Sequence, residues 1–488
     1  MYRDCFMAMT LYAVLAAVVV SCFTSTVAAA DKPHIVFMVA DDLGWNDVGW
    51  INPDIQTPTL DRLARDGVIL NSSYVQPLCS PSRNCFMSGK FPYHTGLQDS
   101  VVFIEQPKYM PADIITIPQR LKTLGYDTHM VGKWHLGFCN WNYTPTYRGF
   151  DTFMGYYGGT EDHFTHVRDK VADYYGYDFR NMTDVYKDVQ GEYSTYVFVK
   201  RAIDIIMNHD KSKPMYLYLP FQAVHGPLQV PAKYSDRYSH IHDLNRMVYS
   251  GMVSSLDDAV YNITTVLENL GFMDNLLLVF TTDNGGPPFA GANNWPLRGG
   301  KATLWEGGTR GAGFVYSKTL LKKRGYTHPG MFHAVDWYPT LLDIAGGDSG
   351  QLEIDGMSQV DMILNGGSSV RNEFVYNIYD AYYAAALRWE DLKLIVGNPG
   401  YSEWYPPPRS DIDVPVMDDS HLGSVMLYNI SADPTEHHDI SKDNPDLVNF
   451  LLQMLAVKNA TRVPAMDPPS DPRSNPVNFN GAWSPGWC

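Results

Sequence analysis

Two short apolar runs constrain the fold of this chain more than any other feature of its sequence. His34–Ala40 and Leu276–Thr282 are rich in β-forming residues and show no alternation of apolar and polar positions. Such runs are typical of central parallel strands that are covered on both faces. Asp127–Val131 and Met215–Val224 predict two further strands, although Pro220 removes a ladder donor from the second. We therefore expect a sheet with a parallel centre.

Helical segments separate these predicted strands. Thr57 and Thr116 are predicted N-caps, each with a proline in the first turn that follows. Longer helices are predicted from Tyr193 to Asn208 and from Met247 to Leu270, and Asp336–Ala345 reads as a capped helix that closes the domain. The alternation predicts the α/β class, with a large, mostly parallel sheet flanked by helices.

The last part of the chain has a different pattern. Small residues gather at Gly366–Ser369, which suggests a boundary. Short strands are then predicted within residues 373–397, and a helix is predicted from Pro445 to Val457. We expect a large catalytic domain over residues 31–365 and a smaller C-terminal α+β domain over residues 366–488.

Residues 1–30 are predicted to be a signal peptide. Arg3 supplies a positive flank, Leu11–Val20 is almost wholly apolar, and Ala28–Ala30 offers a small-residue cleavage site. The apolar run is short for a membrane span, although a retained N-terminal anchor is the alternative. We expect no membrane span after cleavage and a location in the secretory pathway, either lysosomal or extracellular. N-glycans are possible at six sequons: Asn71, Asn142, Asn181, Asn262, Asn429 and Asn459.

The net charge limits the kinds of ligand this chain can bind, and the cysteines raise the question of disulfide pairing. The formal net charge of -16 argues against a nucleic-acid partner, because phosphate backbones are bound by clustered Lys and Arg. Any anionic ligand must therefore be met by a local cationic site. Signal cleavage would leave Cys79, Cys85, Cys139 and Cys488, and the sequence leaves their pairing open.

Polar side chains follow the predicted strands at the point where each strand ends. In open α/β sheets that edge is where ligands bind. Each residue alone has an ordinary explanation, such as a solvated loop, a packed histidine or an Asx turn. The glycine-rich stretch after Pro296 adds Lys301, which can reach the same cleft. The candidates at this edge are Asp41, Asp42, Lys133, His135, His225, Asp283 and Asn284.

Cys79 stands in the stretch Leu78–Arg83, before a predicted helix. Alone, it could be a structural cysteine in a Pro-Ser turn. The sequence Cys79-Ser-Pro-Ser-Arg83, followed by Gly89-Lys90, resembles the signature of the type I sulfatase family. The resemblance runs through most of the chain, and it is strongest to the arylsulfatase B group. The other stretches that carry it are residues 39–49, 95–98, 129–137, 224–231 and 282–286.

This resemblance implies an alkaline-phosphatase-like fold and a set of functional residues. Cys79 would be oxidised to formylglycine by a formylglycine-generating enzyme, and its hydrate would be the nucleophile. Arg83 would steady the formylglycine, while Lys133 and Lys301 would hold the sulfate. His135 would take the proton that releases sulfate, and His225 would protonate the leaving oxygen. One Ca²⁺ would be bound by Asp41, Asp42, Asp283, Asn284 and the modified Cys79.

The chemistry of a sulfate monoester fits this set. Its negative charge repels nucleophiles and its alkoxide leaves poorly, so catalysis needs an activated oxygen, cations and an acid. The oxygen donors favour Ca²⁺ or Mg²⁺ over Zn²⁺. The resemblance implies a sulfated carbohydrate substrate, with N-acetylgalactosamine 4-sulfate of chondroitin or dermatan sulfate as the leading one. The alternatives are a phosphoester or phosphonate hydrolase of the same superfamily, and a catalytically silent secreted glycan-binding protein.

Overall fold

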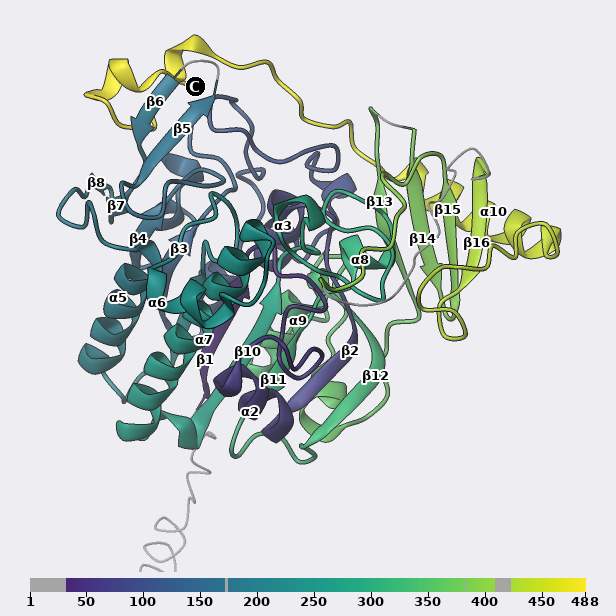
Figure 1. Ribbon diagram of the computed structural model, residues 1–488, viewed down its shortest axis with the longest axis horizontal. Coiled ribbons are helices and arrows are strands. Elements are labelled where there is room, and N and C mark those ends of the chain that lie inside the picture. Colours follow the sequence, from purple (N-terminus) through teal and green to yellow (C-terminus); the bar gives the residue numbers. More distant parts are fainter. Residues whose placement is uncertain (1–31, 172–173, 382, 409–422) are drawn as a thin grey trace, which may run out of the picture. The chain divides into compact units, whose positions relative to one another are not determined.

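A ten-stranded mixed sheet forms the centre of the protein (Figure 1). The computed structural model describes residues 32–171, 174–381, 383–408 and 423–488, so the predicted signal peptide lies outside the described residues. Five adjacent strands are parallel, which confirms the predicted parallel centre, although only four of the five were predicted. In sheet order they are β10 (Leu276–Thr282), β1 (His34–Ala40), β9 (Met215–Pro220), β3 (Asp127–Lys133) and β4 (Thr152–Tyr156).

The edges of this sheet are mostly antiparallel and do not follow from the apolar runs. β11 pairs antiparallel with β10 and with β2, and only β12 then runs parallel to β2. The other edge is completed by two very short strands. These edge strands are β11 (Phe314–Tyr316), β2 (Val68–Tyr74), β12 (Tyr326–His333), β7 (Arg180–Asn181) and β8 (Asp184–Val185).

Helices cover both faces of the sheet, which explains why its central strands are apolar throughout. On β1, Val36 and Met38 belong to one buried cluster, together with residues of the helices that cover that face. Phe37 points to the other face and packs edge-to-face on Phe86. The first face carries α2 (Pro58–Asp66), α5 (Ser194–Asn208) and α7 (Leu244–Asn269), and the second carries α3 (Cys79–Ser88), α4 (Ile117–Thr123) and α9 (Trp337–Ile344). The short helices α6 (Ala232–Ser235) and α8 (Glu306–Thr309) complete the set around the sheet.

The two predicted threonine caps differ. Thr116 forms a capping box with Gln119, as the sequence predicts. Thr57 does not cap α2, because its hydroxyl donates to the Asp61 carboxylate instead. The backbone N–H groups at the start of α2 donate to Asp257 of α7, at 3.1 and 2.7 Å. The cap of α2 is therefore supplied by another helix.

A second, four-stranded antiparallel sheet forms a smaller C-terminal domain. It consists of β13 (Glu373–Ile378), β14 (Ala385–Trp389), β15 (Leu392–Val396) and β16 (Val425–Asn429), and α10 (Pro445–Ala460) packs on it. A buried charge cluster joins this domain to the large one. Lys393 on β15 lies 2.7 Å from Glu436 of the same domain and 3.0 Å from Glu306 of the large domain. The predicted boundary at residues 365 and 366 stays a prediction.

After α10 the chain returns to the large sheet (Figure 1). Backbone N–H groups of Val463 and Met466 donate to the carbonyls of Tyr93 and Gly96. The segment then reaches the ribbon of β5 (Val167–Val171) and β6 (Tyr174–Tyr177), and a disulfide joins Cys139 to Cys488. Of the cysteines that the structure describes, Cys79 and Cys85 form no disulfide.

In the part of the chain that the structure describes, no helix has the length and apolar character needed to cross a membrane.

Candidate active site

The register of the two central strands brings three aspartates together. Ala40 of β1 lies beside Thr282 of β10, so Asp41 and Asp283 follow the same edge of the sheet. Asp42 has a left-handed backbone, with φ of 60°, and its N–H donates to the Asp283 carboxylate at 3.2 Å. All three side chains are buried, and like charges at this spacing need cations between them.

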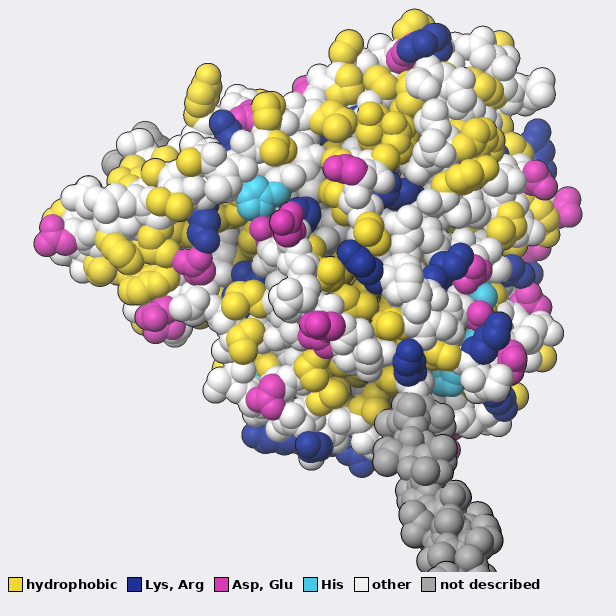
Figure 2. Space-filling view, turned by 180° about the vertical axis from the view of Figure 1, so that it is seen from behind, with side chains coloured by type: hydrophobic (Ala, Val, Ile, Leu, Met, Phe, Trp, Pro, Cys, Tyr) yellow, Lys and Arg dark blue, Asp and Glu magenta, His cyan; other side chains and the backbone are white. Residues whose placement is uncertain are grey.

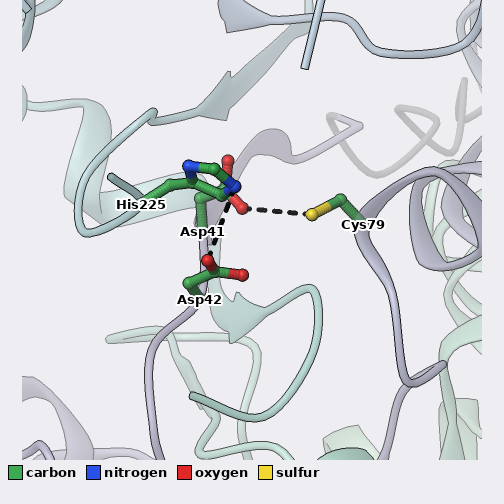
Figure 3. Close-up of side chains that lie close together, drawn as sticks. All are labelled: Asp41, Asp42, Cys79 and His225. Atoms are coloured by element: carbon green, nitrogen blue, oxygen red, sulfur yellow. Dashed lines mark hydrogen bonds and ion pairs between the residues drawn. The ribbon is translucent and has the colours of Figure 1, made fainter. Parts of the chain in front are cut away.

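Cys79 is the first residue of α3 rather than part of a turn before it. Its sulfur lies 3.5 Å from Asp41 Oδ1, and the side chain is buried. Figure 3 shows this contact between the two side chains. Burial raises the pKa of the Cys79 thiol, even though Lys133 and Lys301 act in the opposite direction. An unmodified thiol at this position is therefore protonated and a weak nucleophile.

Three cations accompany the three aspartates. The Lys133 ammonium lies 2.5 Å from Asp41, and the Lys301 ammonium lies 2.7 Å from Asp42. The Arg83 guanidinium donates to one Asp283 oxygen at 3.0 and 2.8 Å and to the carbonyl of Lys133 at 3.0 Å. In this structure Arg83 therefore fixes Asp283 in place.

His225 lies in the segment after β9, and its ring faces Asp42 (Figure 3). Its Nε2 is 3.5 Å from the Asp42 carboxylate, and its Nδ1 is 2.7 Å from the Gly226 carbonyl. Because a carbonyl only accepts, Nδ1 carries the hydrogen. Burial and the nearby Lys301 ammonium lower the pKa of His225 to about 3. The side chain is 21% exposed, so a ligand can reach it.

His135 lies beyond the end of β3. In an extended chain, His135 and Lys133 would lie on the same face. β3 ends at Lys133, however, and His135 has a left-handed φ of 58°, so the two side chains do not share a strand face. Its Nε2 donates to the Val102 carbonyl at 3.1 Å. Nδ1 is therefore the unprotonated nitrogen, and it is buried without a hydrogen-bond partner in the structure. Burial, with Lys133 close by, lowers the pKa of His135 well below its usual value.

The donor set fits a hard divalent cation. Ligand atoms of Asp41, Asp42, Cys79 and His225 lie within 4.8 Å of one another. Asn284 donates to Asp42 at 2.7 Å, and its amide oxygen is a buried acceptor with no partner. Burial raises the pKa of Asp42, but Lys301 and His225 outweigh it and hold the pKa below its usual value. Carboxylate and amide oxygens are the ligands that Ca²⁺ and Mg²⁺ prefer.

The structure thus brings all the predicted site residues to one edge of the large sheet. Sequence reasoning missed the loop after β4, which lies against both histidines. Thr160 donates to the Gly226 carbonyl at 2.6 Å, and His163 donates to the His225 carbonyl at 3.1 Å. No motif marks these residues, because they act through backbone carbonyls. The strand that precedes them, β4, was not predicted either, so the sequence offered no signal for this loop.

Charge on the surface is mixed. On the face shown in Figure 2, Lys and Arg side chains are interspersed with Asp and Glu. The charge pattern there agrees with a chain that meets an anion through a local site and not through a broad basic surface.

Comparisons with known proteins agree with this geometry. A family model described as Sulfatase matches residues 33–347. Arylsulfatase J of Mus musculus is 43% identical, over 94% of this chain and 81% of that protein. N-acetylgalactosamine-6-sulfatase of Homo sapiens is 26% identical, over 94% of this chain and 91% of that protein.

A solved structure described as Ps i-CgsB in complex with k-i-k-neocarrahexaose is also similar. It superimposes with a TM-score of 0.78 at 26% sequence identity, covering 92% of this chain and 97% of that one. The family match covers the large sheet and every residue of the site described above. The chain belongs to the sulfatase family and is a sulfuric ester hydrolase.

Proposed function

We propose that this protein hydrolyses sulfate esters of sugars, with Cys79 converted to formylglycine. The observation that carries the proposal is the contact of Cys79 with Asp41 inside a pocket of three acids and three cations. A buried thiol with a raised pKa has no evident role there. An aldehyde hydrate at the same position supplies the oxygen nucleophile that a sulfate ester requires.

We also propose that Asp41, Asp42, Asp283, Asn284 and the modified Cys79 would hold one Ca²⁺. A bound Ca²⁺ supplies positive charge for sulfate oxygens and for an ionised nucleophile. The acids and cations otherwise balance, so the ion would leave the pocket net positive. That balance supports an anionic ligand at the bottom of the site.

The other side chains have separate tasks. The ammonium groups of Lys133 and Lys301 are positioned to bind sulfate oxygens in place of part of their present ion pairs. His225, on the open side, would give a proton to the departing sugar oxygen from Nε2. Because Nδ1–H is held by the Gly226 carbonyl, the ring must first take up that proton, and the negative charge of the bound sulfate ester would favour this by offsetting the Lys301 charge that lowers its pKa. His135, whose buried Nδ1 is an acceptor, would take the proton that allows sulfate to leave.

Two observations support a carbohydrate substrate. The relatives include a protein named for N-acetylgalactosamine 6-sulfate and a structure with a bound neocarrahexaose. In addition, Phe289 is 69% exposed, and its ring lies 5.1 Å from that of Tyr401. The Tyr401 hydroxyl donates to the Lys301 carbonyl at 3.0 Å, so an apolar surface for a sugar ring adjoins the site. N-acetylgalactosamine 4-sulfate is the leading substrate, as in the arylsulfatase B group.

The decisive experiment is a mass measurement of the peptide that contains Cys79, from purified active protein. We expect an aldehyde in place of the thiol, and loss of sulfate release in Cys79→Ala with the melting temperature retained. Full activity in that variant, or an unmodified cysteine in active protein, would contradict the mechanism and favour a glycan-binding role. Turnover of an aryl sulfate against an aryl phosphate separates the sulfatase from the phosphoester hydrolase.

A location in the lysosome or outside the cell is part of the proposal. Among the sequon residues, Asn142, Asn262 and Asn459 are exposed. The others, Asn71, Asn181 and Asn429, are half-buried. We expect the exposed three to carry glycans, which a mass shift on glycosidase treatment would detect. A formylglycine-generating enzyme would act on Cys79 during maturation.

A further inference from the structure

We propose that Thr160 and His163 are positioning residues that orient His225 for proton transfer to the leaving group. The inference rests on the proposed function, since it assigns a task to groups that contact the proposed acid. Both residues belong to the loop that follows β4, and neither carries a recognisable motif. They act on His225 through two neighbouring carbonyl oxygens.

The Gly226 carbonyl is the first of these oxygens. It accepts the Nδ1–H of His225 at 2.7 Å and the hydroxyl of Thr160 at 2.6 Å. The Gln222 side-chain amide lies 3.4 Å from the same hydroxyl oxygen as a donor, so the hydroxyl hydrogen is directed to Gly226. Thr160 therefore fixes the group that sets the ring orientation of His225 and keeps a hydrogen on Nδ1, so a second proton taken up by the ring is carried by Nε2, the nitrogen that can reach the leaving group.

The carbonyl of His225 itself is the second oxygen. His163 Nε2 lies 3.1 Å from it and must be the donor, so Nδ1 is unprotonated and accepts from the Ser194 hydroxyl at 2.9 Å. His163 and Ser194 are fully buried. The backbone of His225 is thereby tied to Ser194, the first residue of α5.

The same loop also limits His135. A Cβ atom added at Gly159 would lie 2.7 Å from His135 Nε2, which is too close for any side chain. One loop thus lies against both histidines assigned to proton transfer. A shift of this loop would alter the acid and the base together.

The chemical consequence depends on the leaving group. A sugar alkoxide leaves poorly and needs a proton from a correctly aimed N–H. A 4-nitrophenolate leaves without one. Misorientation of His225 should therefore slow hydrolysis of sugar sulfates and leave 4-nitrophenyl sulfate nearly unaffected. A merely structural defect would slow both.

The test compares Thr160→Val, Thr160→Ser and wild type on N-acetylgalactosamine 4-sulfate, or the 6-sulfate if that is the better substrate, and on 4-nitrophenyl sulfate. We expect Thr160→Val to lower kcat about tenfold on the sugar, the size of one lost hydrogen bond, and less than about twofold on the aryl ester. Thr160→Ser should restore most of the rate. Thr165→Val, an exposed threonine of the same loop, is the matched control and should change neither.

His225→Ala, measured on both substrates, separates the role of His225 as the acid from the role of Thr160 in positioning it. If it shows the selective loss on the sugar and Thr160→Val does not, the positioning inference is wrong. If His225→Ala lowers both rates equally, the acid assignment fails and the inference with it. Equal losses in Thr160→Val, with an unchanged melting temperature, would also overturn the inference. A wild type that hydrolyses neither ester would overturn the proposed function itself.

Discussion

Lys393→Met should destabilise the protein in a way that depends on pH. The Lys393 ammonium is fully buried between two carboxylates, 3.0 Å from Glu306 and 2.7 Å from Glu436. These contacts join the C-terminal sheet to the glycine-rich segment that carries Lys301. Methionine keeps the length and apolar character of the side chain but removes its charge.

The magnitude follows from what the two carboxyl groups can do without the ammonium. Burial raises the pKa of Glu436, so that group readily takes up a proton. Burial also raises the pKa of Glu306, but Lys393 and Arg310 outweigh it and hold the pKa at about 2. In the variant Glu306 keeps the Tyr74 and Tyr376 hydroxyls as donors but loses its closest cation, so we expect it to be protonated. Neutralising an ordinary carboxyl costs about 3 kcal/mol at pH 7. The cost falls to about 1 kcal/mol at pH 5.

Urea unfolding of wild type and Lys393→Met at the two pH values measures this difference. Arg473→Met removes a cation whose side chain is 67% exposed, and it should stay within about 0.5 kcal/mol of wild type at both pH values. A loss that is equal at pH 5 and pH 7, or below about 1 kcal/mol at pH 7, would refute the account of the cluster.

Three further predictions concern pH, the disulfide and the metal. Burial raises the pKa of Asp257 to about 6, so its contribution to stability is full below pH 3.8 and is lost as pH rises through about 6. The free energy of unfolding of Asp257→Asn, relative to that of wild type, should therefore rise by about 3 kcal/mol from acid to neutral pH. If the two proteins show the same dependence of stability on pH, this prediction is wrong. Cys488→Ser should speed proteolysis after residue 460 without unfolding the large sheet; equal digestion rates would count against it. EDTA should lower activity and melting temperature, and Ca²⁺ should restore both, whereas indifference to chelation speaks against a metal.

Four of the five central strands could be predicted from the sequence, most clearly β1 and β10, because burial on both faces leaves a continuous apolar run. The fifth, β4, has only five residues and was not predicted. The edge strands could not be predicted. β2 contains Asn71, Ser72 and Ser73, and β12 is interrupted by Pro329 and Gly330, so neither carries a strand pattern. Their pairing is decided by tertiary contacts that propensity does not report.

The site shows the same division. The aspartates follow apolar strands, and that rule placed them at one edge of the sheet. The cap of α2 and the contacts of Thr160 depend on partners far away in the chain. Hydrogen bonds to backbone carbonyls leave no trace in residue identity, because every residue offers the same carbonyl. The sequence therefore predicts the side chains that line the site, but not the residues that hold them in position.

The pairing of β1 with β10 has a consequence for how this protein tolerates change in chain length. Ala40 and Thr282 are neighbours in a continuous register of seven residues, and the acidic edge begins one step beyond. Loss or gain of a single residue in either strand would turn the following side chains to the opposite face. A one-codon deletion would therefore turn the carboxylates away from their cations and toward an apolar face, where an unpaired charge is costly, and the site would be lost together with stability.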